Sequence, residues 1–98
     1  MMYLKLQKPV GNLVDLIRRC GYSYKGRDND ELNFIKRIGL SDYPHFHLYL
    51  KEGDDSLIFN LHLDQKKPSY QGATAHSGDY QGELIEREME RIRKFIGA

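Results

Sequence analysis

The chain has 98 residues, of which 40% are hydrophobic and 30% are charged, and this composition suits one folded domain, residues 1–98, rather than a disordered chain. Fifteen basic and fourteen acidic side chains leave a formal charge of +1, so the overall charge gives no attraction to nucleic acid or to an anionic membrane. A single cysteine, Cys20, excludes an internal disulfide framework, and no apolar run approaches the ~20 residues that span a bilayer. We therefore expect a cytoplasmic protein with no membrane partner.

The first part of the chain predicts a strand, a helix, a loop and a second strand. Residues 2–7 (MYLKLQ) alternate well enough for a short strand, although an ordered arm is an equal alternative. Apolar residues at helical spacing predict a helix from about 12 to 20, with Asn12 as its N-cap. The polar segment 22–31 (YSYKGRDNDE) is typical of a loop, and 31–40 (ELNFIKRIGL) is typical of a strand.

Residues 45–64 predict a β-hairpin whose turn lies in the sequence KEGDDS. Alternation makes one face of this hairpin apolar, which is typical of an antiparallel pair covered on one side. The other face carries His45, His47, Tyr49, Ile58, Asn60, His62 and Asp64. A central turn pairs His45 with His62, and His47 with Asn60. A register error of two residues would leave the histidines neighbours, whereas an error of one would bury them.

The last part of the chain predicts a long loop, 66–80, and an amphipathic helix, 83–96. The predicted order is therefore (β)αβββα, an α+β fold. We expect a two-layer sandwich in which two helices pack on one face of a three- or four-stranded antiparallel sheet. The histidines then lie on the outer face, where the loop can fold back across them.

Three histidines on one sheet face predict a divalent-metal site, with zinc as the first choice of cofactor. Neutral imidazole is a common metal ligand, and zinc takes about four nitrogen, oxygen or sulfur ligands. His45, His47 and His62 would supply three of them. His76, in the predicted loop, would supply the fourth.

Such a site is either catalytic or structural, and both alternatives are open. Three ligands and a bound water, whose pKa falls toward ~7, would support hydrolytic or phosphodiesterase-like chemistry. Asp64 or Glu83 is then the expected general base. Four histidine ligands would instead make a closed, structural site.

Two resemblances bear on nucleic acid as a partner. The tripeptide HFH, residues 45–47, resembles the His-hydrophobe-His motif of rolling-circle replication and relaxase endonucleases, which implies a divalent ion on a strand and a helical tyrosine that cuts single-stranded DNA. Tyr80 is the nearest candidate nucleophile, but QGE follows it where that family has Tyr-x-x-Lys. The αβββα order is similar to that of double-stranded-RNA-binding domains, but GELIERE replaces the lysine-rich start of their last helix. These departures do not favour a nucleic-acid partner.

A non-enzymatic binding module is the alternative function. The same outer face, with Tyr49, Ile58 and the histidines, would bind another protein, a nucleic acid or a second copy of the chain. Association that is lost on acidification but is insensitive to a chelator would favour this alternative, whereas sensitivity to a chelator would favour a metal.

Overall fold

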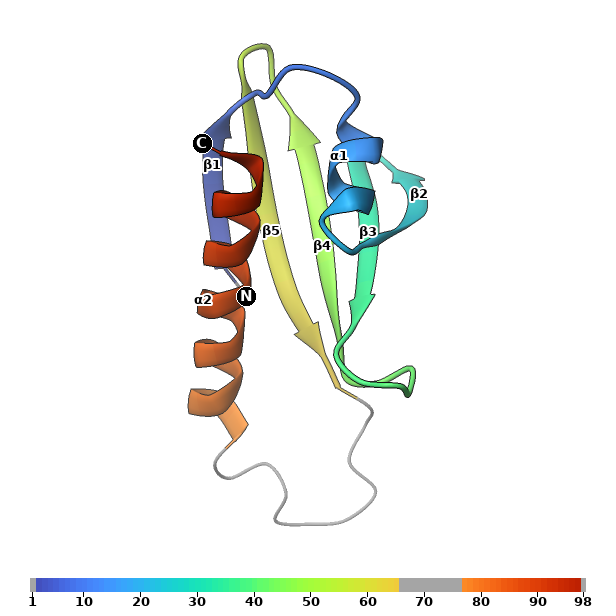
Figure 1. The fold of residues 1–98 in the computed structure, drawn as a ribbon, viewed down its shortest axis with the longest axis vertical. Helices are drawn as coiled ribbons and strands as arrows, with labels where there is room; N and C mark the ends of the chain where they lie inside the picture. Colours follow the sequence, from blue (N-terminus) through green and yellow to red (C-terminus); the bar gives the residue numbers. More distant parts are fainter. Residues whose placement is uncertain (1, 66–76, 98) are drawn as a thin grey trace.

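The computed structural model describes residues 2–65 and 77–97, which form a five-stranded antiparallel sheet and two helices (Figure 1). The α+β class is confirmed, but the sheet has five strands where three or four were predicted. The strand order is β1-β5-β4-β3-β2, so β2 to β5 form a meander and β1 adds to its β5 edge. The elements are β1 (Met2–Gln7), α1 (Leu13–Arg19), β2 (Ser23–Asp28), β3 (Glu31–Arg37), β4 (His45–Glu52), β5 (Ser56–Asp64) and α2 (Ser77–Ile96).

Strand β2 corrects the prediction of a loop at 22–31. It lies at the edge of the sheet, and nearly all of its side chains are exposed, so it lacks the apolar alternation that identifies a half-buried strand. Its pairing with β3 shifts register between Tyr24 and Gly26, and Gly26 has a φ of 110°. A polar edge strand with a bulge at a glycine resembles a loop in sequence.

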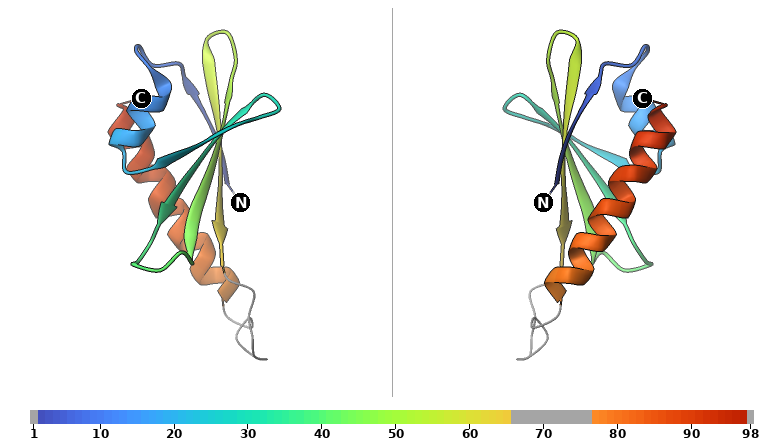
Figure 2. Two further views of the ribbon diagram at one scale, coloured as in Figure 1. Left: turned by 90° about the vertical axis from the view of Figure 1, so that its right-hand side faces the viewer. Right: turned by 90° about the vertical axis from the view of Figure 1, so that its left-hand side faces the viewer.

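Both helices lie on the same side of the twisted sheet (Figure 2), as predicted. Helix α1 begins after Asn12, whose side-chain oxygen accepts from the backbone of Asp15, and a glycine with a φ of 108°, Gly21, follows it. The core between helices and sheet contains the fully buried side chains Ile17, Phe34, Leu48, Leu50, Leu57, Phe59, Leu61, Met89 and Ile92. The other face of the sheet, which we call the outer face, has no helix of the described chain against it.

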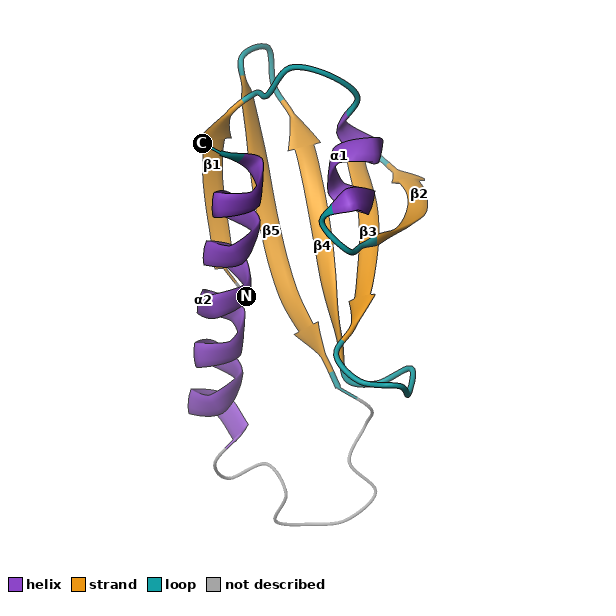
Figure 3. Cartoon of the chain, viewed as in Figure 1, coloured by secondary structure: helices purple, strands orange, loops and turns teal. Residues whose placement is uncertain are grey.

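Helix α2 begins earlier than predicted. Residues 77–80, which were expected in a loop, belong to this helix, so Tyr80 lies within α2 rather than ahead of it (Figure 3). The rest of the predicted loop, 66–76, lies outside the described residues. None of the helices in the described ranges is long and apolar enough to cross a membrane.

Candidate functional site

Strands β4 and β5 place the histidines of the hairpin on the outer face. In their ladder His45 lies opposite Asp64, and His47 lies opposite His62. The predicted pairing of His45 with His62 and of His47 with Asn60 is therefore wrong by two residues. Because a shift of two keeps every side chain on its face, the histidines remain neighbours. We refer to His45, His47, His62 and Asp64 as the histidine cluster.

The carboxylate of Asp64 contacts two of the imidazoles. Its Oδ2 atom lies 3.2 Å from Nε2 of His45 and 3.4 Å from Nδ1 of His47. The register explains this arrangement, since Asp64 is directly opposite His45 and diagonal to His47, and same-face neighbours of this kind are close enough for side-chain contact. One carboxylate oxygen therefore joins the two imidazoles of β4.

The other ring nitrogen of each imidazole is hydrogen-bonded to an oxygen that can only accept. Nδ1 of His45 donates to the backbone carbonyl of Asp42 over 2.7 Å. Nε2 of His47 donates to Oδ1 of Asn33 over 3.0 Å, and the Asn33 amide is oriented by its own Nδ2, which donates to a backbone carbonyl of β3. The nitrogens that face Asp64 are therefore the unprotonated ones whenever both imidazoles are neutral.

Three acceptor atoms thus converge in the cluster when Asp64 is ionised and the imidazoles are neutral. Burial lowers the pKa of His47 and outweighs the opposite effect of Asp64, which favours the neutral form of the His47 ring. Lone pairs that face one another are unfavourable unless a proton or a cation lies between them. In this protonation state the cluster therefore concentrates acceptor atoms, of which Nδ1 of His47 receives a hydrogen bond from the Tyr49 hydroxyl.

Aromatic rings enclose the imidazoles. The Tyr43 ring packs against His45 at 4.8 Å between centroids, and His45 is buried. The Tyr49 ring stacks on His47 at 4.1 Å, and its hydroxyl donates to Nδ1 of His47 over 3.3 Å. The same ring meets His62 in an edge contact at 5.3 Å. This enclosure restricts water on one side of the cluster and leaves Asp64, whose side chain is 42% exposed, as the open side.

The cluster is not a complete metal site in the described chain. Within residues 2–65 and 77–97, no three His, Cys, Asp or Glu side chains stand in the arrangement of a complete metal-binding group. The two distances from Asp64 Oδ2 to the imidazole nitrogens are close to the separation of about 3.3 Å between ligand atoms of a tetrahedral zinc with bonds of about 2.0–2.1 Å. A complete metal site would require rotation of the His62 side chain toward Asp64, or a further ligand from another part of the chain.

The remaining predicted site residues lie apart from this cluster or outside the described chain. His76 lies outside the described residues, so its role as a fourth ligand stays a prediction. Glu83 is exposed on α2 and accepts a hydrogen bond from Arg87 over 3.2 Å. Helix α2 packs on the inner face of the sheet, opposite to the face of the histidines. Of the two predicted general bases, Asp64 is the one that lies within the cluster.

The residues that orient the imidazoles were missed in the sequence. Asn33 occupies an outward position of a predicted strand, and pairing that strand with the hairpin would have placed it beside Tyr49. The sequence does not indicate the role of Asp42, because this residue binds His45 through its backbone carbonyl rather than its side chain. Tyr43 lies in the segment SDYP, which reads only as a turn between two strands.

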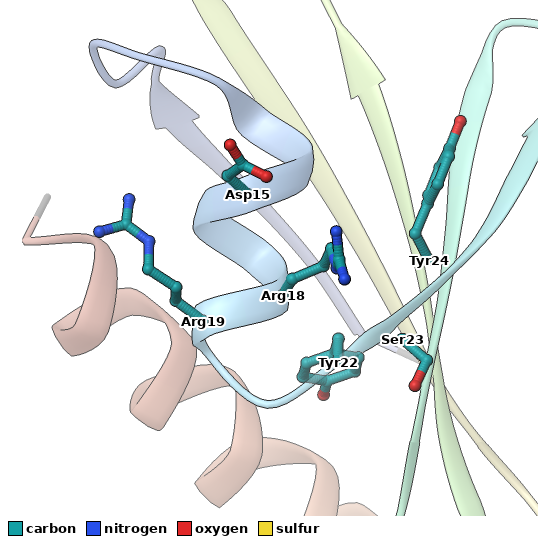
Figure 4. A pocket seen from close by; sticks show the side chains of 6 residues that line it. All are labelled: Asp15, Arg18, Arg19, Tyr22, Ser23 and Tyr24. Atoms are coloured by element: carbon teal, nitrogen blue, oxygen red, sulfur yellow. The ribbon is translucent and has the colours of Figure 1, made fainter.

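A separate cleft of about 870 Å³ lies where α1 meets the start of β2, and Figure 4 shows its lining residues. Arg18 points from α1 toward β2, whereas Arg19 points to the opposite side of the helix (Figure 4). Asp15 offsets part of the positive charge. One arginine beside a carboxylate does not indicate a particular ligand, so the histidine cluster remains the candidate site.

Comparison with known proteins identifies no relative, since no protein-family model, no curated protein and no solved structure matches the chain.

Proposed function

We propose that the histidine cluster binds a divalent metal ion, zinc first, on the outer face of the sheet. One observation supports this most directly. Nε2 of His45 and Nδ1 of His47 face the same carboxylate oxygen of Asp64, while the opposite nitrogen of each ring donates to an oxygen. Metal-ligating histidines donate their second N–H in this way, which sets the tautomer and orients the ring.

The proposed ligands are His45 Nε2, His47 Nδ1 and a carboxylate oxygen of Asp64. His62, directly opposite His47, is a further ligand if its ring turns away from Tyr49, and His76 is the proposed ligand from outside the described chain. The lowered pKa of His47 favours the neutral, ligating form at pH 7.

The proposed activity is hydrolytic or phosphodiesterase-like. A metal with three protein ligands and an open position activates a bound water at neutral pH. The open position would lie on the exposed side of the cluster, where Asp64 stands, and the second oxygen of this carboxylate is the proposed proton acceptor. We place the activity in the cytoplasm, because the one cysteine of the chain is buried and unpaired.

The test is the metal content of tag-free protein, measured by plasma mass spectrometry and followed by titration with zinc. The variants His47→Ala and Asp64→Asn remove proposed ligands, and Lys5→Ala is the matched control, because Lys5 is exposed on a neighbouring strand. We expect about one equivalent of metal in the wild type and in the control, and a loss in both ligand variants. Wild-type protein that is free of metal and takes up no zinc at micromolar concentration would contradict the proposal.

A non-enzymatic binding face is the second candidate, and one observation favours it. Tyr3 and Ile58 lie on the outer face with side chains 62% and 37% exposed, and they stand on neighbouring strands, where they offer apolar surface to a partner. Sedimentation analysis of the wild type beside Tyr3→Ser/Ile58→Ser tests self-association through this face. Association that persists with a chelator and is lost in the variant would support the binding module over the metal site.

A further inference from the structure

A cleft of about 720 Å³ adjoins the histidine cluster. It lies at a corner of the sheet, where β3 continues past the start of β2. Ser23 is the first residue of β2 and pairs with Ile35, so Lys36 and Arg37 lie beyond the β2–β3 ladder. The resulting hollow is of the size that ligand pockets have, about 300–1,000 Å³.

Positive charge dominates the lining of this cleft, which we call the cationic cleft. Lys25, Lys36 and Arg37 line it together with one carboxylate, Asp42. The Asp42 carboxylate lies 3.7 Å from the Arg37 guanidinium, and both side chains are exposed, so their attraction is weak and leaves Arg37 able to bind an anion. Lys36 also acts on the buried carboxylate of Glu88, so Lys25 and Arg37 would contribute most to an anion in the cleft.

The cationic cleft is continuous with the histidine cluster. His45 lines the cleft and also contacts Asp64 in the cluster. Arg37 is directly opposite His45 in the β3–β4 ladder, which places the two side chains side by side on the outer face. An anion bound by Arg37 would therefore lie next to His45, one of the proposed metal ligands.

The chemistry of the lining favours phosphate over other anions. Lys25 and Arg37 together match a group with two negative charges, and an arginine fork matches its oxygens. The Ser23 hydroxyl adds a neutral donor to the lining, and the half-exposed ring of Tyr43 offers an apolar surface beside it. A ligand with a single carboxylate has one negative charge and would pair with only some of these cations and donors.

We propose that the cationic cleft binds the phosphate group of a phosphate ester on which the histidine cluster acts. The catalytic half of this inference rests on the proposed function, whereas phosphate binding itself needs no metal. In this proposal Arg37 and Lys25 position the phosphate of the substrate beside the proposed metal.

The test is a titration of metal-free protein with inorganic phosphate at constant ionic strength, followed by amide chemical shifts. The variant Lys25→Ala/Arg37→Ala removes two cations from the cleft. Its matched control, Lys5→Ala/Lys51→Ala, removes the same charge from exposed positions away from the cleft. We expect shifts around Ser23 and Arg37, about tenfold or more weaker binding in the cleft variant, and unchanged binding in the control.

The same titration with His47→Ala separates this inference from the proposed function, because His47 is a proposed ligand but does not line the cleft. Phosphate binding by wild-type protein that takes up no metal would support the cleft and overturn the metal site, whereas phosphate binding by a His47→Ala variant that has lost its metal would support both. Metal uptake without phosphate binding at millimolar concentration, or equal weakening in the cleft variant and the control, would overturn the cleft alone.

The organic part of the ester is tested with a nucleoside monophosphate and a sugar phosphate. Tighter binding of the nucleotide, with the difference lost in Tyr43→Leu, would support an ester whose base packs on Tyr43. Equal binding of both esters, above that of sulfate, would support recognition through the phosphate alone. Binding of sulfate as tight as phosphate and both esters would overturn the assignment to phosphate.

Discussion

Asn33 of β3 holds the imidazole of His47 on the neighbouring strand, because its Oδ1 atom accepts from Nε2 over 3.0 Å. This bond sets the tautomer of His47 and turns Nδ1 toward Asp64, which lies 3.4 Å away. A polar residue of β3 thus determines which atom of a β4 histidine is available in the cluster.

We predict that Asn33→Ala weakens zinc binding by about 10–100-fold, the usual effect of losing a group that orients a ligand. The reason is a mixed tautomer of His47, since the acceptor of the Nε2–H group is then lost and the longer hydrogen bond from the Tyr49 hydroxyl to Nδ1 is left to favour the Nε2–H form. Nitrogen shifts of the imidazole should show this mixture directly. Asn33→Asp retains an acceptor and should restore the Nε2–H tautomer. A single tautomer and wild-type affinity in Asn33→Ala would contradict the prediction.

We predict that Asp64→Asn lowers zinc affinity by about 100-fold or more, because it removes the charged oxygen that faces both imidazoles. Competition with a chromophoric chelator measures this affinity. Asp42→Asn is the matched control, since the side chain of Asp42 is 89% exposed and its backbone carbonyl is what binds His45. The control should bind zinc as the wild type does, and equal losses in both variants would show that general charge rather than ligation is responsible.

The ion pair of Glu88 and Arg91 within α2, which Tyr22 joins from the segment between α1 and β2, predicts a pH-dependent stability. The Tyr22 hydroxyl donates to Glu88 over 2.6 Å, and Arg91 binds both carboxylate oxygens at 2.8 Å. Burial raises the pKa of Glu88, but the hydrogen bonds from Arg91 and Tyr22 outweigh it and hold the pKa below its ordinary value of 4.5. The stabilisation is therefore present above the unfolded pKa and is lost as pH falls through the folded pKa.

We predict that Tyr22→Phe lowers the free energy of unfolding by about 1–3 kcal/mol at pH 7, because it removes one hydrogen bond to a buried carboxylate. The difference from the wild type should shrink below pH 4.5, as Glu88 becomes protonated. Urea unfolding at pH 7, 5 and 3 measures it, with Tyr24→Phe on the exposed edge strand as the control. A difference that is as large at pH 3 as at pH 7 would exclude the carboxylate as its source.

At the bulge of β2, the cost of a positive φ can be measured without a steric clash of the added Cβ atom. Gly26 has a φ of 110°, and a Cβ atom built there would meet nothing within 4 Å. We expect Gly26→Ala to lower the free energy of unfolding by about 1 kcal/mol or more, through the strain of a positive φ alone. Gly39→Ala is the control, because this glycine is equally open but has no positive φ. Equal unfolding midpoints in urea for the two variants would contradict the role of the bulge.

Local patterns explain why some elements were predictable. The apolar face of the hairpin specified which side of β4 and β5 is buried, because a shift of one residue would have exposed Phe59 and buried His62. The helix N-cap at Asn12 and the helical stripe of α2 depend on neighbours within one or two turns, and both were found in the sequence. Strand β2 was missed because an exposed edge strand has no such stripe.

The sequence by itself determined the α+β class, the two helices and the hairpin, together with the placement of three histidines and Asp64 on one face. The alternation of apolar and polar residues and the helical spacing of apolar residues are local patterns, so they can be recognised directly in the sequence. Only the tertiary structure decided that Asp64 rather than His62 lies opposite His45, and that Asn33 and the Asp42 carbonyl hold the imidazoles. These contacts depend on register and on a loop that packs over the sheet, and both are set by packing between segments that are distant in sequence.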